Sequence, residues 1–171
     1  MDAEMELQPI VIETWTSEHP RWPELTGVVT ELEQTDWVAF TADWHLSSHM
    51  LVALQRDRVA GFLYYVTQEI GVEEDRPAVM LEGAILTEGK VIAFGVAPEQ
   101  RRKGIGRLLQ EQLIQECRAQ HCHQIRSHSS DANVENHRLK LAMGFAMHPL
   151  VPGSGKEGAY FLMPLRSSPS L

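Results

Sequence analysis

Residues 91–107 read VIAFGVAPEQRRKGIGR, and this stretch carries the most informative pattern of the chain. Together with Lys90 it begins as a nearly unbroken apolar run over residues 90–97, which is typical of a strand buried on both faces of a sheet. Pro98 ends the strand, and residues 104–120 then place apolar side chains at helical spacing on one face. The stretch therefore predicts a buried strand that passes through a short loop into an amphipathic helix.

The start of this helix has the composition of an anion site. Gly104 and Gly106 carry no side chain that would keep a phosphate away from the free backbone N–H groups, and the helix dipole favours an anion there. Residues 101–107 hold four basic side chains on a chain with a formal net charge of −8. A Walker loop would need Lys and then Ser or Thr after Gly104, and a dinucleotide fingerprint would need glycine in place of Leu109.

The rest of the chain has the patterns of strands and helices on both sides of this unit. We expect strands at residues 10–14, 51–55, 59–67, 123–129, 145–150 and 159–163, and helices within 17–49 and over 104–120 and 133–143. Residues 78–88 carry no clear pattern. This order predicts an α/β (α+β) fold with one central mixed sheet. We expect a single domain over residues 1–171, with a frayed tail at 167–171.

Composition limits the function classes. The chain has 171 residues, of which 43% are hydrophobic and 22% charged, so it is not a disordered polymer. Its 15 basic and 23 acidic residues argue against a nucleic-acid partner. No apolar run is long enough for a membrane span, and the first ten residues are acidic, unlike a secretory signal. These features predict a cytoplasmic protein with reduced Cys117 and Cys122.

Two motifs resemble those of a known family. The segment VAPEQRRKGIG at residues 96–106 resembles the acyl-CoA-binding motif of the GNAT superfamily of N-acetyltransferases. Residues 133–145 are similar to its second motif, a helix that begins with Asn133 and ends at Gly144 and Phe145 before a strand. The resemblance implies a GNAT-like central mixed sheet of about six to seven strands flanked by about four helices.

The resemblance implies acetyl-CoA as the cofactor and assigns roles to the residues of both motifs. The backbone N–H groups of residues 102–107 would cradle the pyrophosphate. The strand at residues 94–96 would part from its neighbour to pair with the pantetheine arm, and the Val96 N–H, or that of a residue beside it, would polarise the thioester carbonyl. Asn133 would lie beside the pantetheine chain. The predicted coenzyme-binding residues are Phe94, Gly95, Val96, Arg101, Arg102, Lys103, Gly104, Ile105, Gly106, Arg107 and Asn133.

The reaction implied by the family is direct acetyl transfer to a primary amine through a tetrahedral intermediate, which needs a base and a proton donor. Family members often carry Tyr seven residues after the leading Asn, whereas this chain has Lys140. Lys140 is either the donor or a surface lysine, and His137, one turn earlier, is the second candidate. Glu82 is the candidate base, and Glu88 is interpreted as a solvated loop carboxylate.

Other interpretations remain open. A GNAT-like module that senses acyl-CoA without transferring it would also fit the missing Tyr. Cys117, His121, Cys122 and His123 cluster, but without a second ligand pair we interpret them as the surface of a helix end and expect no metal. His45 and His49 lie four apart, and we expect them on a helix near the substrate cleft.

The acceptor is left undetermined between a small molecule and a peptide amine. We expect the tryptophans to lie in the core, although two near a cleft could select an amine by cation–π contact. We expect a homodimer by analogy with relatives that pair through their C-terminal strands.

Overall fold

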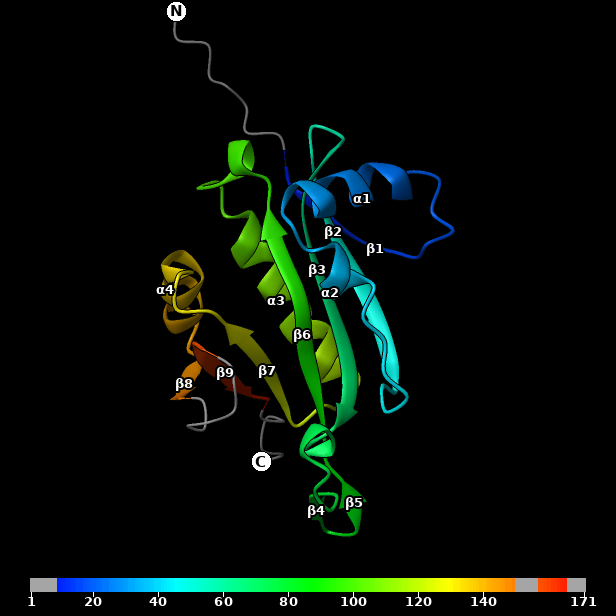
Figure 1. Cartoon of the computed structure of the whole chain (residues 1–171), viewed down its shortest axis with the longest axis vertical. Coiled ribbons are helices and arrows are strands. Elements are labelled where there is room, and N and C mark those ends of the chain that lie inside the picture. The colour runs from blue at the N-terminus through cyan, green and yellow to red at the C-terminus, as the bar shows by residue number, and fades with distance from the viewer. Residues whose placement is uncertain (1–8, 150–156, 166–171) are drawn as a thin grey trace, which may run out of the picture.

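The computed structural model describes residues 9–149 and 157–165. Within them, seven strands form one sheet in the order β1-β2-β3-β6-β7-β9-β8 (Figure 1). The strands are β1 Val11–Trp15, β2 Ser47–Gln55, β3 Arg58–Glu69, β6 Thr87–Val96, β7 Gln124–Ser129, β8 Ala146–Pro149 and β9 Ala159–Pro164. Neighbours pair antiparallel except β6 and β7, which are parallel. The mixed sheet confirms the predicted α+β class.

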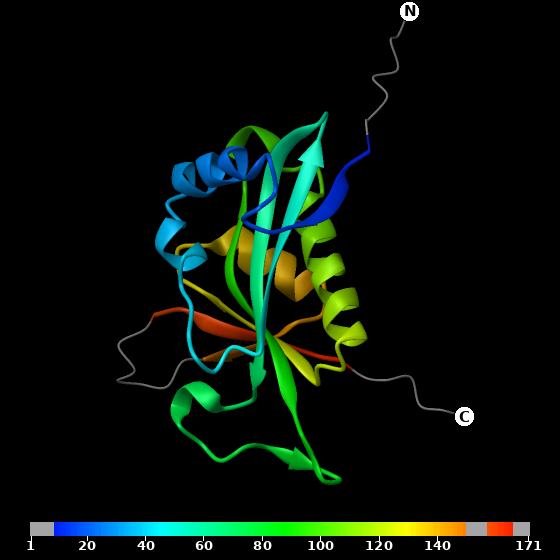
Figure 2. The ribbon, with the colours of Figure 1, turned by 90° about the vertical axis from the view of Figure 1, so that its right-hand side faces the viewer.

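Four α-helices of the described chain cover the sheet. They are α1 Trp22–Glu31, α2 Thr35–Val38, α3 Ile105–Ala119 and α4 Val134–Ala142. In Figure 2, α1 and α2 cover one face of the sheet and α3 covers the other. The helix predicted at 104–120 is confirmed, and so is the Gly144 cap beyond α4, whose φ of 94° is left-handed. No helix of the described ranges is both long and apolar enough to span a membrane.

The helices divide the core into two clusters, one on each face of the sheet. Leu51 and Leu63 pack with Leu109 of α3, whereas Val52 and Phe62 pack with Leu25 of α1. Since β2 and β3 lie in the middle of the sheet, their successive side chains enter the two clusters in turn. This burial on both faces explains why these strands read as continuous apolar runs.

The segment at residues 17–49 departs from its helical prediction. The left-handed Glu33, at φ 58°, separates α1 from the single turn of α2, and β2 already begins at Ser47. His45 therefore lies in a loop, and His49 lies on β2, where its ring stacks on Tyr65 with centroids 4.8 Å apart. The expectation that both histidines share a helix is wrong, because His49 belongs to β2 and pairs with Tyr65 of β3.

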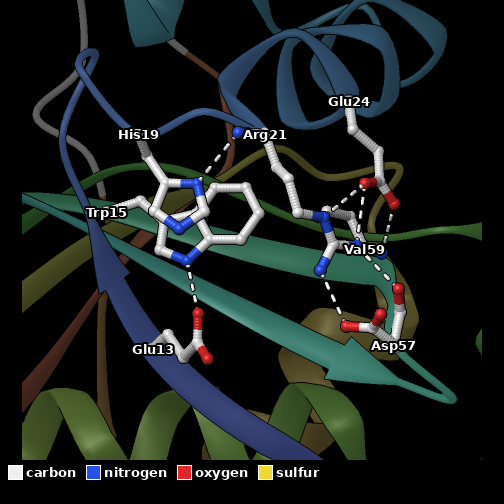
Figure 3. Close-up of polar contacts among 7 residues, drawn as sticks. All are labelled: Glu13, Trp15, His19, Arg21, Glu24, Asp57 and Val59. Carbon is white, nitrogen blue, oxygen red and sulfur yellow. Dashed lines mark hydrogen bonds and ion pairs between the residues drawn. The ribbon is translucent and has the colours of Figure 1, made fainter.

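Polar contacts fix the start of α1 to the turn between β2 and β3 (Figure 3). The Arg21 guanidinium donates to the carboxylate of Glu24 at 2.8 Å and to that of Asp57 at 2.8 Å. The second carboxylate oxygen of Glu24 accepts from the Val59 N–H at 2.9 Å. These contacts tie the start of α1 to the β2–β3 turn, so that the helix lies over one face of the sheet.

Residues 78–88, left unassigned by the sequence, form a small hairpin and the start of β6. The hairpin consists of β4 Met80–Leu81 and β5 Ala84–Ile85, at the end of the molecule away from α1. Because β6 begins at Thr87, Glu88 is 1% exposed and accepts from Arg126 at 3.0 Å. The interpretation of Glu88 as a solvated loop carboxylate is therefore wrong.

The two cysteines are free thiols, and both are buried. Cys117 lies on the inner face of α3, where its Sγ would be 2.4 Å from a Cβ added to Gly89. Cys122 follows the helix and is 5% exposed. The interpretation of these residues as an exposed helix end is wrong for both thiols, because the end of α3 packs against the sheet. The tail predicted at 167–171 lies outside the described residues.

Candidate active site

The site is organised by a gap between the parallel strands β6 and β7. The two strands pair only from Glu88 with Gln124 to Val91 with Ser127. Beyond these pairs β6 continues along β3 to Val96 while β7 turns away, and Figure 1 shows the two arrows diverging. The upper half of β6 therefore has a free edge facing the gap.

Backbone groups of β6 are directed into this gap. The Phe94 C=O accepts from Gln34 Nε2 at 3.1 Å, and the Val96 C=O accepts from Arg101 Nε at 3.1 Å. The Ala97 N–H donates to the Ala60 C=O of β3 at 2.8 Å, so by alternation residues 95 and 97 bond toward β3 and residues 94 and 96 face the opposite side. In an antiparallel ladder the N–H and C=O of one residue point to the same side. The N–H groups of Phe94 and Val96 consequently face the gap and can donate to a ligand there.

A first cavity, which we call the helix-start cavity, lies where the free edge of β6 meets the N-terminus of α3. It has a volume of about 740 Å³ and includes the start of α4. Ten of the eleven predicted coenzyme-binding residues line it: Phe94, Gly95, Val96, Arg101, Arg102, Gly104, Ile105, Gly106, Arg107 and Asn133. The exception is Lys103, whose Nζ donates to Gln100 at 2.9 Å.

The start of α3 can bind an anion in this cavity. The Leu108 N–H donates to the Gly104 C=O, and no side chain of the described residues caps the helix, so the N–H groups of residues 105–107 stay available. Gly104 has a left-handed φ of 79°, and a Cβ there would meet nothing within 4 Å, so a side chain would enter open space. Three lining arginines add positive charge. The arrangement suits a phosphate group.

A second cavity of ≈ 730 Å³, which we call the cleft cavity, opens on the other side of the gap. Its walls come from α2 and the loop after it, from residues 90–94 of β6, and from β7 and α4. Gln34, Phe94, Asn133 and Asn136 line both cavities, so the two meet at these residues. A ligand held along β6 in the first cavity can therefore present one end to the second.

A polar ladder of four buried residues forms one wall of the cleft cavity. Ser127 and Ser129 lie two apart on β7, and Asn136 and Lys140 lie four apart on α4, so each pair shares a face. Asn136 Nδ2 donates to Ser129 Oγ at 3.1 Å, and Lys140 Nζ donates to Ser127 Oγ. All four residues line the cavity, and none is more than 8% exposed.

Lys140 is the most unusual member of the ladder. It is 1% exposed, so its alternative interpretation as a surface lysine is wrong. Its Nζ lies 5.5 Å from the centre of the Phe161 ring, and it forms no ion pair with any residue that the structure describes. Burial lowers the pKa of Lys140 to about 7, because the charged form loses its hydration. The side chain can therefore both hold and release a proton near neutral pH.

The other proposed catalytic residues lie elsewhere. His137 packs on Phe161 with ring centroids 5.2 Å apart, and it is not among the described residues that line either cavity. Glu82 is exposed in the turn between β4 and β5, and it does not line them either. Asn133 lines both cavities, but its side chain also caps α4 by accepting from the Asn136 N–H at 3.3 Å.

Sequence reasoning missed Asn136 and the two serines of the ladder. The available signal was their spacing, since Ser127 and Ser129 alternate along a strand and Asn136 precedes Lys140 by one helical turn. Spacing alone does not show that the two faces meet. Their contact depends on how α4 packs against β7, which is a tertiary property.

A family model described as the Acetyltransferase (GNAT) family matches residues 10–145, a range that includes β6, β7, the start of α3 and the whole of α4. The chain belongs to the GNAT acetyltransferase family. This GNAT acetyltransferase is thus an enzyme of a family that uses acetyl-CoA and acetylates amines. No curated protein sequence matches it significantly.

Solved structures share the fold of this GNAT acetyltransferase. NAA60 of Arabidopsis thaliana in complex with acetyl-CoA aligns with a TM-score of 0.65 and 14% identity over 90% of this chain and 96% of its own. Ribosomal-protein-alanine N-acetyltransferase from Brucella melitensis aligns with a TM-score of 0.61 and 20% identity over 91% and 99%. An agmatine N-acetyltransferase aligns with a TM-score of 0.65 and 14% identity over 92% and 100%. At these identities the likeness shows the fold alone.

Proposed function

We propose that this protein transfers the acetyl group of acetyl-CoA directly to a primary amine in the gap between β6 and β7. The observation that carries the proposal is the junction of the two cavities. One cavity has the donors and charge for a phosphate at the start of α3, and the other holds the buried amine of Lys140. A thioester that reached from the first cavity into the second would be accessible to an amine from the cleft.

The residues of the helix-start cavity fit coenzyme A. The N–H groups of residues 105–107, with Arg101, Arg102 and Arg107 beside them, would hold the pyrophosphate. The free edge of β6 would pair with the amide groups of the pantetheine arm, as an added strand does. Glycine at position 106 keeps the space between α3 and β6 free for the pantetheine arm, because a Cβ there would lie 3.2 Å from the Phe94 ring.

Acetyl-CoA supplies an acetyl group that is activated as a thioester. The N–H of Phe94, which lines both cavities, or that of Val96 would donate to the carbonyl oxygen and stabilise the negative charge that develops on it. The acceptor nitrogen would add to the carbonyl carbon to give a tetrahedral intermediate, from which the C–S bond would break as sulfur leaves with the bonding electron pair. Lys140 Nζ would give that sulfur a proton and would regain one from the acceptor nitrogen. A pKa of about 7 suits both transfers.

The same pKa removes the need for a carboxylate base such as Glu82, which lies outside both cavities. Only the neutral form of Lys140 can accept the proton of the acceptor, and only the charged form can protonate the sulfur. The group alternates between these forms within one cycle. Net proton balance is kept, because the proton released by the amine equals the proton gained by the thiol.

Gly104→Glu tests the coenzyme site. The new carboxylate would enter the open space of the helix-start cavity, where its bulk and charge exclude a pyrophosphate. We expect at least a 100-fold loss of acetyl-CoA affinity in calorimetry and no thermal shift with acetyl-CoA or coenzyme A. ATP serves as the ligand control, and the size of the wild-type shift reports binding through linkage.

Gly83→Glu is the matched control. Gly83 has a similar φ of 83°, and a Cβ there also meets nothing within 4 Å, but the residue lies in the exposed β4–β5 turn. The Gly83→Glu variant should bind acetyl-CoA with the affinity of wild type. Unchanged affinity in Gly104→Glu would contradict the phosphate site. Coenzyme binding by wild type without thiol release in the presence of any amine would favour a sensor of acyl-CoA instead.

A further inference from the structure

The cleft cavity differs in character between its inner end and its mouth. The inner end is the polar ladder of β7 and α4, which adjoins the helix-start cavity at Asn136. The mouth is formed by α2 and the loop that follows it, which contribute Trp37, Phe40 and Trp44. An acceptor that spans the cavity therefore meets hydrogen-bonding groups at one end and aromatic surface at the other.

Asn136 presents an unsatisfied acceptor at the inner end. Its Nδ2 donates to Ser129 Oγ, which fixes the amide so that Oδ1 is the remaining acceptor. The residue is 8% exposed, and Oδ1 is buried without a hydrogen-bond partner among the described residues. A buried acceptor that is left unpaired is unfavourable. An N–H donor of a bound molecule would satisfy it.

Three exposed aromatic side chains lie together at the mouth. Trp37 is 59% exposed, Phe40 40% and Trp44 42%, all within eight residues of chain. His45 supports two of them by edge contacts, with ring centroids 5.7 Å from Phe40 and 6.3 Å from Trp44. Apolar surface gathered at the rim of a cavity marks a binding site for an apolar group.

Charge at the cavity favours a cation over an anion. Glu73 is neutralised by ion pairs with Lys90 and Arg126. Glu33 and Glu157 also line the cavity, and neither forms an ion pair within the ranges that the structure describes. These two carboxylates would attract an ammonium group toward the cleft, while the ladder, with Lys140 in it, offers no carboxylate to hold a second cation deep inside.

We propose that the acceptor is a primary amine carried on an aromatic or bulky apolar body. Its amine nitrogen donates to Asn136 Oδ1, which directs the nitrogen lone pair toward the thioester, and its body packs against Trp37, Phe40 and Trp44. This inference rests on the proposed function, because the nitrogen bound at Asn136 is the atom that attacks. Linear diamines lack the apolar body, and small alkylamines leave the mouth empty.

The test compares three amines of stated chemistry: 2-phenylethylamine, ethylamine and 1,4-diaminobutane. Thiol release from acetyl-CoA gives kcat/KM for each. Burying one aromatic group is expected to raise kcat/KM for 2-phenylethylamine about 10- to 100-fold above ethylamine. Trp37→Ala should remove most of that preference, chiefly by lowering kcat/KM for 2-phenylethylamine. Met147→Ala, which removes an exposed apolar side chain of β8, is the control and should leave all three values unchanged.

Asn136→Ala and Asn136→Leu test the inner end. Both should lower kcat/KM at least tenfold for 2-phenylethylamine and ethylamine alike, with coenzyme A affinity unchanged in calorimetry. A loss of coenzyme affinity instead would assign Oδ1 to a pantetheine amide N–H and overturn its role toward the amine. Equal or higher kcat/KM with 1,4-diaminobutane or an alanine-initiated peptide would overturn the apolar body.

A binding measurement separates this inference from the proposed function. Quenching of tryptophan fluorescence by 2-phenylethylamine in the presence of coenzyme A reports occupation of the mouth, since Trp37 and Trp44 line it. Quenching that Trp37→Ala abolishes, without thiol release, would refute transfer while supporting the proposed ligand class. Thiol release with no preference among the amines would support transfer and refute the ligand class.

Discussion

Lys140→Met removes the one buried ammonium of the polar ladder and should change how stability depends on pH. The pKa of Lys140 falls from its ordinary value of 10.5 to about 7 because the side chain is buried. Between these two values the unfolded chain binds a proton at this residue and the folded chain does not. Wild-type stability therefore rises with pH through this window, by about 1.4 kcal/mol for each pH unit.

The whole pKa shift changes the free energy of unfolding by about 5 kcal/mol between pH 7 and pH 10.5. Over the accessible range from pH 7 to pH 9, wild type should gain about 3 kcal/mol relative to Lys140→Met. Below pH 7 Lys140 is charged in both the folded and the unfolded wild-type protein, so the difference in unfolding free energy between wild type and Lys140→Met becomes constant. There the methionine variant should be the more stable, because it buries no charge.

Urea unfolding followed by tryptophan fluorescence at half-unit steps from pH 6 to pH 9 gives the free energy of unfolding of both proteins. Other titrating groups are common to both, so their contributions cancel in the difference. Lys103→Met, at an exposed lysine of the α3 loop, is the control and should run parallel to wild type. If the difference between wild type and Lys140→Met stays flat over this range, the lysine titrates normally and cannot serve as the proton donor proposed above.

Two further predictions concern packing and the buried ion pairs. Gly89→Ala should destabilise the fold by about 1–3 kcal/mol in urea unfolding, because its Cβ would lie 2.4 Å from Cys117 Sγ, and Cys117→Ala should restore most of the loss. Without that restoration, the cause is not the contact with sulfur. Burial alone would raise the pKa of Glu73, but its ion pairs with Lys90 and Arg126 lower it to about 2. The stability that this carboxylate contributes is complete above pH 4.5 and lost as the pH falls toward 2, so wild type should lose about 3 kcal/mol relative to Glu73→Gln over that interval, and parallel acid-unfolding curves would exclude the ion pairs.

Most of the fold could be predicted because its signals are local. The apolar run of β6, the period of α3 and the Gly144 cap are properties of neighbouring residues, and each appears in the structure where the sequence places it. The errors fall where partners distant in sequence decide the outcome. His49 became part of a strand by pairing with β3, and Glu88 became buried because β6 starts early and Arg126 neutralises it.

The anion-binding start of α3 could be predicted from the sequence alone. Glycines 104 and 106 and the nearby arginines act through backbone conformation, the helix dipole and local charge, all of which depend on residues within a few positions of one another. The chemistry of the cleft depends on long-range packing. The burial of Lys140 and the unpaired oxygen of Asn136 exist because α4 packs its inner face against β7, which brings together groups separated along the chain. A pKa near 7 follows from that loss of water, and no local pattern encodes it.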